Sequence, residues 1–148
     1  MKTVICAIAV SFSTLASAQE AKDESHIFLT VPVGSYHFNR DKDWREWNPG
    51  VGIEYAHNKD WSIVAGSYLN SHDKRTNYLG GAWYPIHLNE QVKLGLTVAS
   101  VTGYKYHVGA YPSLVMQGDR VGFVLIAAPS VGKGTSAFMG FQLRLRMN

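Results

Sequence analysis

Few side chains in this sequence of 148 residues could do chemistry, and the best placed are His37 and Ser71. Each lies where an apolar segment gives way to a polar, charged one. A serine hydroxyl can transfer an acyl group when a base takes its proton and another group orients that base. A plainer interpretation also stays open, because His37 suits a strand end with no further role and Asn-Ser-His-Asp is good turn chemistry.

The other histidines show no spacing typical of metal ligands. The sequence also lacks a glycine-rich loop of the kind that cradles phosphate. We therefore expect neither a metal site nor a cofactor. The formal net charge of the full sequence is +3, and it is +2 without Lys2, which belongs to the N-terminal segment (residues 1–18). So mild a positive charge does not suggest a nucleic-acid partner.

Four prolines, Pro32, Pro49, Pro112 and Pro129, lie in or at the ends of segments that otherwise look like strands. Because proline donates no ladder hydrogen bond, it is confined to strand edges, strand starts and bulges. Pro49 and Pro129 are explained by strand ends, whereas Pro32 and Pro112 sit deeper. In a closed sheet such a proline would open a gap between two strands, through which a lipid chain could pass from the membrane into the lumen.

Residues 1–18 are predicted to be a secretory signal peptide. Lys2 supplies the positive start, the stretch from Val4 to Leu15 is apolar or small, and Ala16-Ser17-Ala18 fits a cleavage site. The apolar run is too short to span a bilayer as a helix, which needs about 20 residues. The single cysteine, Cys6, lies inside this segment. The exported chain would thus have no disulfide and must find its stability elsewhere.

The rest of the chain alternates with a period of two, which is typical of strands. Val92, Leu94, Leu96 and Val98 alternate with Lys93, Gly95, Thr97 and Ala99, and residues 139–146 do the same. Turn signals divide residues 19–148 into eight such segments. They are 26–38, 48–57, 60–70, 75–86, 91–101, 106–116, 119–127 and 135–146.

Most of these segments have about the 9–11 residues that a tilted transmembrane strand needs, and a few are slightly longer. Without a helix-length apolar run, this part of the chain could cross a membrane only as a closed barrel. We therefore predict an all-β fold, an eight-stranded antiparallel transmembrane up-and-down β-barrel.

The connections alternate between tight turns and longer loops. The tight ones are Asn58-Lys59, residues 87–90 and Gln117-Gly118, and the longer ones are 39–47, 71–74, 102–105 and 128–134. This asymmetry is the pattern of barrels in the bacterial outer membrane, whose long loops face the outside. We therefore expect that location, and a monomer.

A soluble barrel of the lipocalin type has the same strand count but points its apolar face inward. The two folds differ in the face that carries the charged residues. Glu54, Lys93, Arg144 and Arg146 all fall on the face predicted to line the lumen, which favours the membrane barrel.

Six short pieces of the sequence are informative through their order and spacing. They are Pro32 followed five residues later by His37, Asn48-Pro49-Gly50-Val51-Gly52, Tyr68-Leu69-Asn70-Ser71, Gly81-Ala82-Trp83-Tyr84-Pro85-Ile86, Lys93-Leu94-Gly95-Leu96-Thr97 and Ala128-Pro129. Together they resemble the lipid A palmitoyltransferase (PagP) family of outer-membrane enzymes, from about Pro32 to Leu143.

This resemblance implies an enzyme that moves a palmitoyl chain from a glycerophospholipid to lipid A. The expected partners are then phospholipid and lipopolysaccharide. In the family the lumen holds the acyl chain, and gaps at prolines admit lipid. The resemblance further implies that His37, Asn70 and Ser71 form the catalytic group, with Asn70 at the position of the family's aspartate.

Two features keep a second hypothesis open, a non-catalytic outer-membrane barrel of the same descent that binds lipid or supports surface integrity. Asn70 could orient a histidine by hydrogen bonding, but it cannot stabilise an imidazolium by charge. Moreover, His37 shares its parity with Val31 and Val33, so simple alternation would aim it at lipid. A bulge or the end of strand pairing would be needed to turn it inward.

Overall fold

The structure is a computed structural model that describes residues 24–132 and 135–148. The expected signal peptide, residues 1–18, lies outside these ranges. Each expected strand is present, with ends that differ by at most about three residues. The strands are β1 (His26–His37), β2 (Gly50–Ala56), β3 (Trp61–Leu69), β4 (Arg75–His87), β5 (Val92–Val101), β6 (Val108–Gln117), β7 (Val121–Ala128) and β8 (Phe138–Arg146). Within the described ranges, no helix is long and apolar enough to cross a bilayer.

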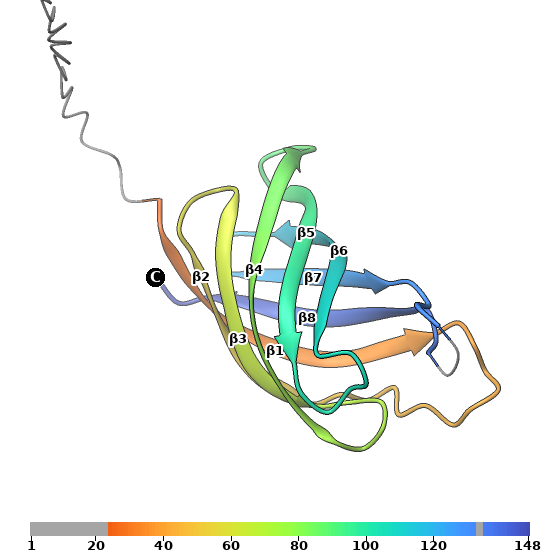
Figure 1. Cartoon of the computed structure of the whole chain (residues 1–148). Helices are drawn as coiled ribbons and strands as arrows, with labels where there is room; N and C mark the ends of the chain where they lie inside the picture. The colour runs from red at the N-terminus through yellow and green to blue at the C-terminus, as the bar shows by residue number, and fades with distance from the viewer. Residues whose placement is uncertain (1–23, 133–134) are drawn as a thin grey trace, which may run out of the picture.

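The eight strands form one closed antiparallel barrel in chain order, which confirms the predicted fold class (Figure 1). β1 closes the barrel against β8, in a register that runs from Phe28 opposite Arg146 to His37 opposite Phe138. The chain extends this closure past β8, where the Met147 N–H donates to the Ile27 carbonyl at 2.9 Å. Closure removes the free sheet edges, which a bilayer does not tolerate.

The two ends of the barrel differ as the sequence predicts. At one end, the turn end, the strands are joined by residues 57–60, 88–91 and 118–120. At the other, the loop end, the connections are residues 38–49, 70–74, 102–107 and 129–137. The described chain starts and finishes at the turn end, as Figure 1 shows.

The outer surface of the barrel is apolar and the lumen contains the charges. Large apolar side chains are exposed on the outside, among them Ile27, Val51, Ile53, Trp61, Ile63, Leu79, Trp83 and Phe123. The buried set in the lumen instead contains the charged Glu54 and Arg144, beside small residues and the rings of Phe28 and Tyr84. The apolar face therefore points outward, where it suits contact with lipid, and the lipocalin-like alternative is excluded.

A buried ion pair fills the lumen toward the turn end. The Arg144 guanidinium donates from Nε and Nη2 to the two Glu54 carboxylate oxygens at 2.8 and 2.7 Å, and from Nη1 to Gln117 Oε1 at 3.0 Å. It also lies 3.4 Å from the centroid of the Phe28 ring. Only 1% of Glu54 and 3% of Arg144 is exposed, so each charge depends on the other for compensation.

Replacing Glu54 by alanine is expected to lower the free energy of unfolding by about 3–5 kcal/mol, because it leaves the Arg144 charge buried and unpaired. Urea unfolding of the purified protein in detergent micelles measures this loss. The double variant Glu54→Ala, Arg144→Met should recover most of it, since apolar replacement of a whole buried pair is often neutral. A double variant as unstable as the single one would show that the unpaired charge is not the cause.

A β-bulge in β1 decides which side chains enter the lumen near the loop end. The register against β8 shifts between Pro32 and Gly34, so Val33 is an extra residue. Phe28 and Thr30, before the bulge, face the lumen, and the shift by one residue turns Ser35 and His37 inward after it. The structure therefore supplies the bulge that His37 needs in order to face inward.

Candidate functional site

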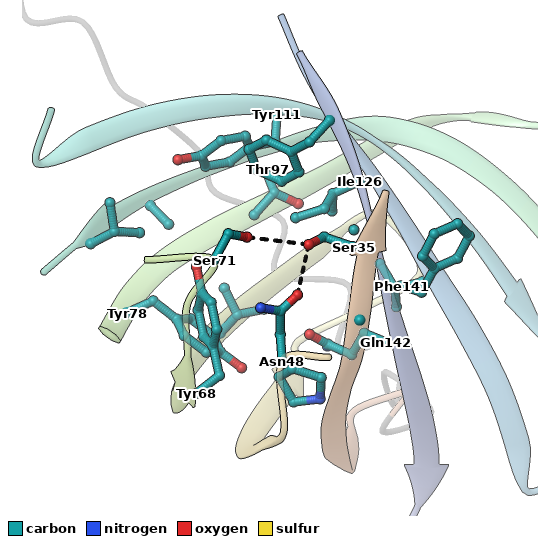
Figure 2. Close-up of a pocket in the computed structure, with 18 of the residues that line it drawn as sticks. Ser35, Asn48, Tyr68, Ser71, Tyr78, Thr97, Tyr111, Ile126, Phe141 and Gln142 are labelled. Atoms are coloured by element: carbon teal, nitrogen blue, oxygen red, sulfur yellow. Dashed lines mark hydrogen bonds between the residues drawn. The ribbon is translucent and has the colours of Figure 1, made fainter. Parts of the chain in front are cut away.

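A wide recess of about 1200 Å³ opens at the loop end, lined by His37, Trp44, Ser71 and His72 among others. Below it, inside the barrel, lies a narrower cavity of about 130 Å³. The two spaces share five lining residues, Tyr68, Ser71, Tyr104, Tyr111 and Phe138. The recess and the inner cavity therefore meet at these mostly aromatic side chains, of which Figure 2 labels Tyr68, Ser71 and Tyr111.

His37 is held in the recess by aromatic rings. Its imidazole stacks on Trp44 with ring centroids 4.6 Å apart and packs against Phe138 at 5.4 Å. Only 4% of the residue is exposed, yet its Nδ1 has no hydrogen-bond partner among the described residues. A buried imidazole nitrogen without a hydrogen-bond partner is rare in folded proteins, which marks His37 as a candidate functional residue.

Ser71 belongs to a small hydrogen-bond chain. Its Oγ lies 3.3 Å from Ser35 Oγ, and the Ser35 hydroxyl donates to Asn48 Oδ1 at 2.7 Å (Figure 2). Neither Ser35 nor Asn48 was predicted as a site residue. Regular alternation along the strand places Ser35 on the outer face, and its side chain faces inward only because of the bulge. Ser71 and His37 line the same recess, but no hydrogen bond joins them in the structure.

Both side-chain amide atoms of Asn70 form hydrogen bonds, within its own loop and with neighbouring residues. Its Oδ1 accepts hydrogen bonds from the backbone N–H groups of His72 and Lys74 at 2.8 and 3.0 Å. Its Nδ2 donates to Thr76 Oγ1 at 3.0 Å and to the Gly103 carbonyl at 3.3 Å. With 0% of the residue exposed, the amide builds the turn that carries Ser71, and none of these partners is His37.

Replacing Asn70 by aspartate is expected to destabilise the protein by about 1–3 kcal/mol and not to raise any activity. A carboxylate cannot donate to the Gly103 carbonyl, nor to Thr76 Oγ1, whose own proton is given to the Thr102 carbonyl at 2.8 Å. Urea unfolding measures the loss. Asn77→Asp, at an exposed position of β4, is the matched control and should change stability little. Equal stability of the two variants would contradict the assignment of the Asn70 hydrogen bonds.

Two of the four prolines coincide with breaks in strand pairing. The β6–β7 ladder runs from Gln117 opposite Gly122 to Ser113 opposite Ile126 and stops beside Pro112. Both strands continue toward the loop end, paired with their other neighbours. The barrel wall thus has a break between β6 and β7, which runs from Pro112 toward the loop end.

The β1–β2 ladder stops at Thr30 opposite Gly52, two residues before Pro32. Beyond it, β1 is bonded to the segment 46–48 of the first loop, where the Ser35 N–H donates to the Glu46 carbonyl at 2.8 Å. A Cβ at Gly34 would lie 2.6 Å from that same oxygen, so the close approach requires glycine. Pro49 and Pro129 instead lie at strand ends, just before β2 and just after β7.

The loops around the recess contain paired charges and a tyrosine with a shifted pKa. Arg40 pairs with Glu46 at 2.7 Å, and Arg45 pairs with Asp73. Burial raises the pKa of the Tyr104 phenol. Within residues 24–132 and 135–148, no group of three or more His, Cys, Asp or Glu side chains is arranged to hold a metal ion.

No family model matches the chain, and no curated protein matches it. Solved structures do match. A chain from work on the de novo design of transmembrane β-barrels is 11% identical, with a TM-score of 0.58 over 82% of this chain and 95% of that chain. The solution NMR structure of the designed protein TMB2.3 is also 11% identical, with a TM-score of 0.60 over 86% and 98% of the two chains. At such low identity the likeness concerns the fold alone, and it shows that this chain has the fold of a transmembrane β-barrel.

Proposed function

We propose that this chain is an acyltransferase of the bacterial outer membrane that moves a palmitoyl-type chain from a glycerophospholipid to lipid A. The ordered sequence pieces that resemble the palmitoyltransferase family support the proposal. The structural observation that carries it is the bulge at Val33, because it turns His37 into the recess that Ser71 also lines. The break above Pro112 offers lipid a route through the wall, whereas beyond Pro32 the segment 46–48 is hydrogen-bonded to β1 in place of β2.

The proposed reaction exchanges one ester for another. Ser71 Oγ attacks the carbonyl carbon of the donor ester, the bond to the glycerol oxygen breaks, and His37 carries the proton from Ser71 to that oxygen. A lysophospholipid leaves. A lipid A hydroxyl then attacks the acyl-serine, with His37 taking its proton and returning it to Ser71. Since an ester is broken and an ester is formed, no cofactor or energy source is needed.

The surroundings of the site suit these roles. The stack on Trp44 fixes the plane of the His37 ring, and the Asn70 amide holds the turn that carries Ser71. The inner cavity continues below Ser71 and is lined mainly by apolar and aromatic side chains, so an acyl chain attached at Ser71 would extend into it.

A second candidate function is non-catalytic lipid binding by the same barrel, and the size of the cavity favours it. An apolar cavity of about 150 Å³ takes a ligand the size of benzene. The inner cavity, at about 130 Å³, is no larger, so a whole palmitoyl chain exceeds the space present and could enter only if the lining moved apart. Binding of a shorter lipid segment would not need that movement.

A transfer assay with the purified protein separates the two functions. Proteoliposomes contain a phospholipid with a labelled palmitoyl chain as donor and purified lipid A as acceptor. We expect labelled lipid A with the natural chain and none with Ser71→Ala. If the natural chain binds the labelled phospholipid but yields no labelled lipid A, the acyltransferase proposal is wrong and lipid binding is supported.

A further inference from the structure

We propose that Lys74 and Lys105 form a phosphate-binding site in the recess, which holds a phosphate group on the sugar headgroup of the acceptor lipid A. The inference rests on the proposed acyltransferase function, and it names two residues that set the specificity for the acceptor. The positive lining of the recess supports it, as do the hydrogen bonds that fix the two lysine-bearing loops.

The lining of the recess is positive. Its ionisable side chains other than tyrosine are those of His37, His72, Lys74, Lys105 and His107. Among the residues that the structure describes, no aspartate or glutamate lines the recess. In the adjoining loops, Glu46 is paired with Arg40 and Asp73 with Arg45, so these carboxylates are already compensated. The recess would therefore attract an anion.

Both lysines have a charge that a ligand can use. Lys74 and Lys105 are exposed, and within residues 24–132 and 135–148 neither forms an ion pair with a carboxylate. The Lys105 ammonium lies over the ring of Tyr106, 5.5 Å from its centroid, and Tyr106 also lines the recess. This contact holds the Lys105 charge at the wall of the recess.

The Asn70 amide joins the two loops that carry the lysines. In the loop after β3, the Lys74 N–H donates to Asn70 Oδ1 at 3.0 Å, and the Asn70 N–H donates to the Lys74 carbonyl at 2.8 Å. In the loop after β5, the Gly103 carbonyl accepts from Asn70 Nδ2 at 3.3 Å. The backbone near both lysines is thus ordered before a ligand arrives, which lowers the entropic cost of binding.

A sugar phosphate fits this site better than the phosphate of the donor phospholipid. A phosphate monoester, as found on the sugars of lipid A, carries a charge of about −1.5 to −2 at pH 7, and the diester of a glycerophospholipid carries less. Two lysines match the charge of the monoester, and lysine binds phosphate as a point charge. Because Ser71 lines the same recess, one sugar headgroup could place its phosphate on the lysines and a hydroxyl near the acyl-serine.

Binding of lipid A, measured without any turnover, tests the site. The purified protein in uncharged detergent micelles is titrated with phosphorylated lipid A, and isothermal titration calorimetry gives the Kd. Lys74→Gln and Lys105→Gln should each raise the Kd about fivefold, the effect expected of one lysine at a charged lipid surface, and the double variant about 25-fold. Lys74→Arg and Lys105→Arg keep the charge and should bind like the natural chain.

Two controls isolate the phosphate. Lipid A without its phosphates should bind equally well to the natural chain and to the double variant, because the lysines then have no anion to contact. Lys42→Gln is the matched control, since Lys42 is exposed in the first loop at the same end of the barrel but does not line the recess. It removes the same charge and should change the Kd less than twofold.

Steady-state acyl transfer in proteoliposomes separates this inference from the proposed function. The double variant should raise the KM for lipid A and leave kcat and the KM for phospholipid unchanged. Lysine-dependent binding of lipid A without any acyl transfer would keep the phosphate site and refute the acyltransferase. Active transfer by a double variant whose Kd and KM for lipid A are unchanged would refute the site and leave the function standing.

Two further outcomes would overturn the site in variants that circular dichroism shows to be folded. A higher KM for phospholipid, with lipid A unaffected, would assign the lysines to the donor. A loss of affinity in Lys42→Gln as large as that in Lys74→Gln would show a general attraction between the loops and lipid A, without a defined site.

Discussion

His37→Ala is expected to lower the rate of acyl transfer by about 10²- to 10⁴-fold, the loss typical of removing a general base. The imidazole lies in the recess with Ser71, its buried Nδ1 has no hydrogen-bond partner among the described residues, and its stack on Trp44 keeps the ring in one plane. The proteoliposome assay with labelled phospholipid and lipid A measures the rate. Circular dichroism confirms that the variant still forms the barrel.

His72→Ala is the matched control for this prediction. His72 lines the same recess and packs edge-on against Trp44, with centroids 5.2 Å apart, but it is exposed. Its loss should change the rate only a few-fold. If His72→Ala abolishes transfer and His37→Ala does not, His72 is the base and the assignment of His37 is wrong.

Deletion of Val33 is expected to leave acyl transfer largely intact, because Val33 is the one residue of the bulge without a partner on β8. Without it, Gly34, Ser35 and His37 keep their partners Phe141, Gly140 and Phe138, so β1 alternates regularly and Ser35 and His37 still face the lumen. The recess therefore keeps its imidazole, and Ser71 keeps its hydrogen-bond partner. Transfer rate and circular dichroism, measured on the same sample, test the activity and the fold of this variant.

Deletion of Asp43 controls for the change in length. Asp43 is exposed in the first loop, and its removal shortens that loop by one residue without changing the pairing of β1 with β8. This variant should keep most of its activity. If the Val33 deletion folds but is far less active than the Asp43 deletion, pairing with β8 alone does not keep Ser35 and His37 in the lumen.

The architecture of this barrel was predictable because it follows from a simple repeat. Alternation with a period of two assigns a face to each residue of β5 and β8, and the charged lumen follows from the positions of Glu54 and Arg144. Turn residues mark the short connections, so the two ends of the barrel could be told apart. Alternation and turn residues are properties of short sequence segments, so they can be read without knowing the tertiary contacts.

The site was harder to predict, because it depends on a break in that repeat. Counting parity from Val31 places His37 toward lipid, and only the extra residue Val33 reverses this. Pro32 and Gly34 flank the bulge and were its only local signs. Ser35 was not predicted as a site residue for the same reason, because regular alternation places its side chain on the outer face of the barrel.

The partners of the two asparagines depend on tertiary contacts that no spacing reveals. Asn70 stands beside Ser71 in sequence, yet its amide is used by its own turn, Thr76 and Gly103. Asn48 is far from Ser71 in sequence, yet it is the amide that reaches the serine pair through Ser35. The sequence therefore placed Asn70 beside Ser71 but could not reveal the hydrogen-bond chain through Ser35.

Mass spectrometry of lipid A from bacteria that express this chain, after the outer membrane is disrupted so that phospholipid reaches the outer leaflet, tests the central proposal most directly. Cells with the natural chain should contain lipid A with one additional palmitoyl-type chain, and cells with Ser71→Ala should not. Absence of the added chain in cells whose membranes contain the folded natural protein would contradict the acyltransferase function. An added chain that persists with Ser71→Ala would contradict the site.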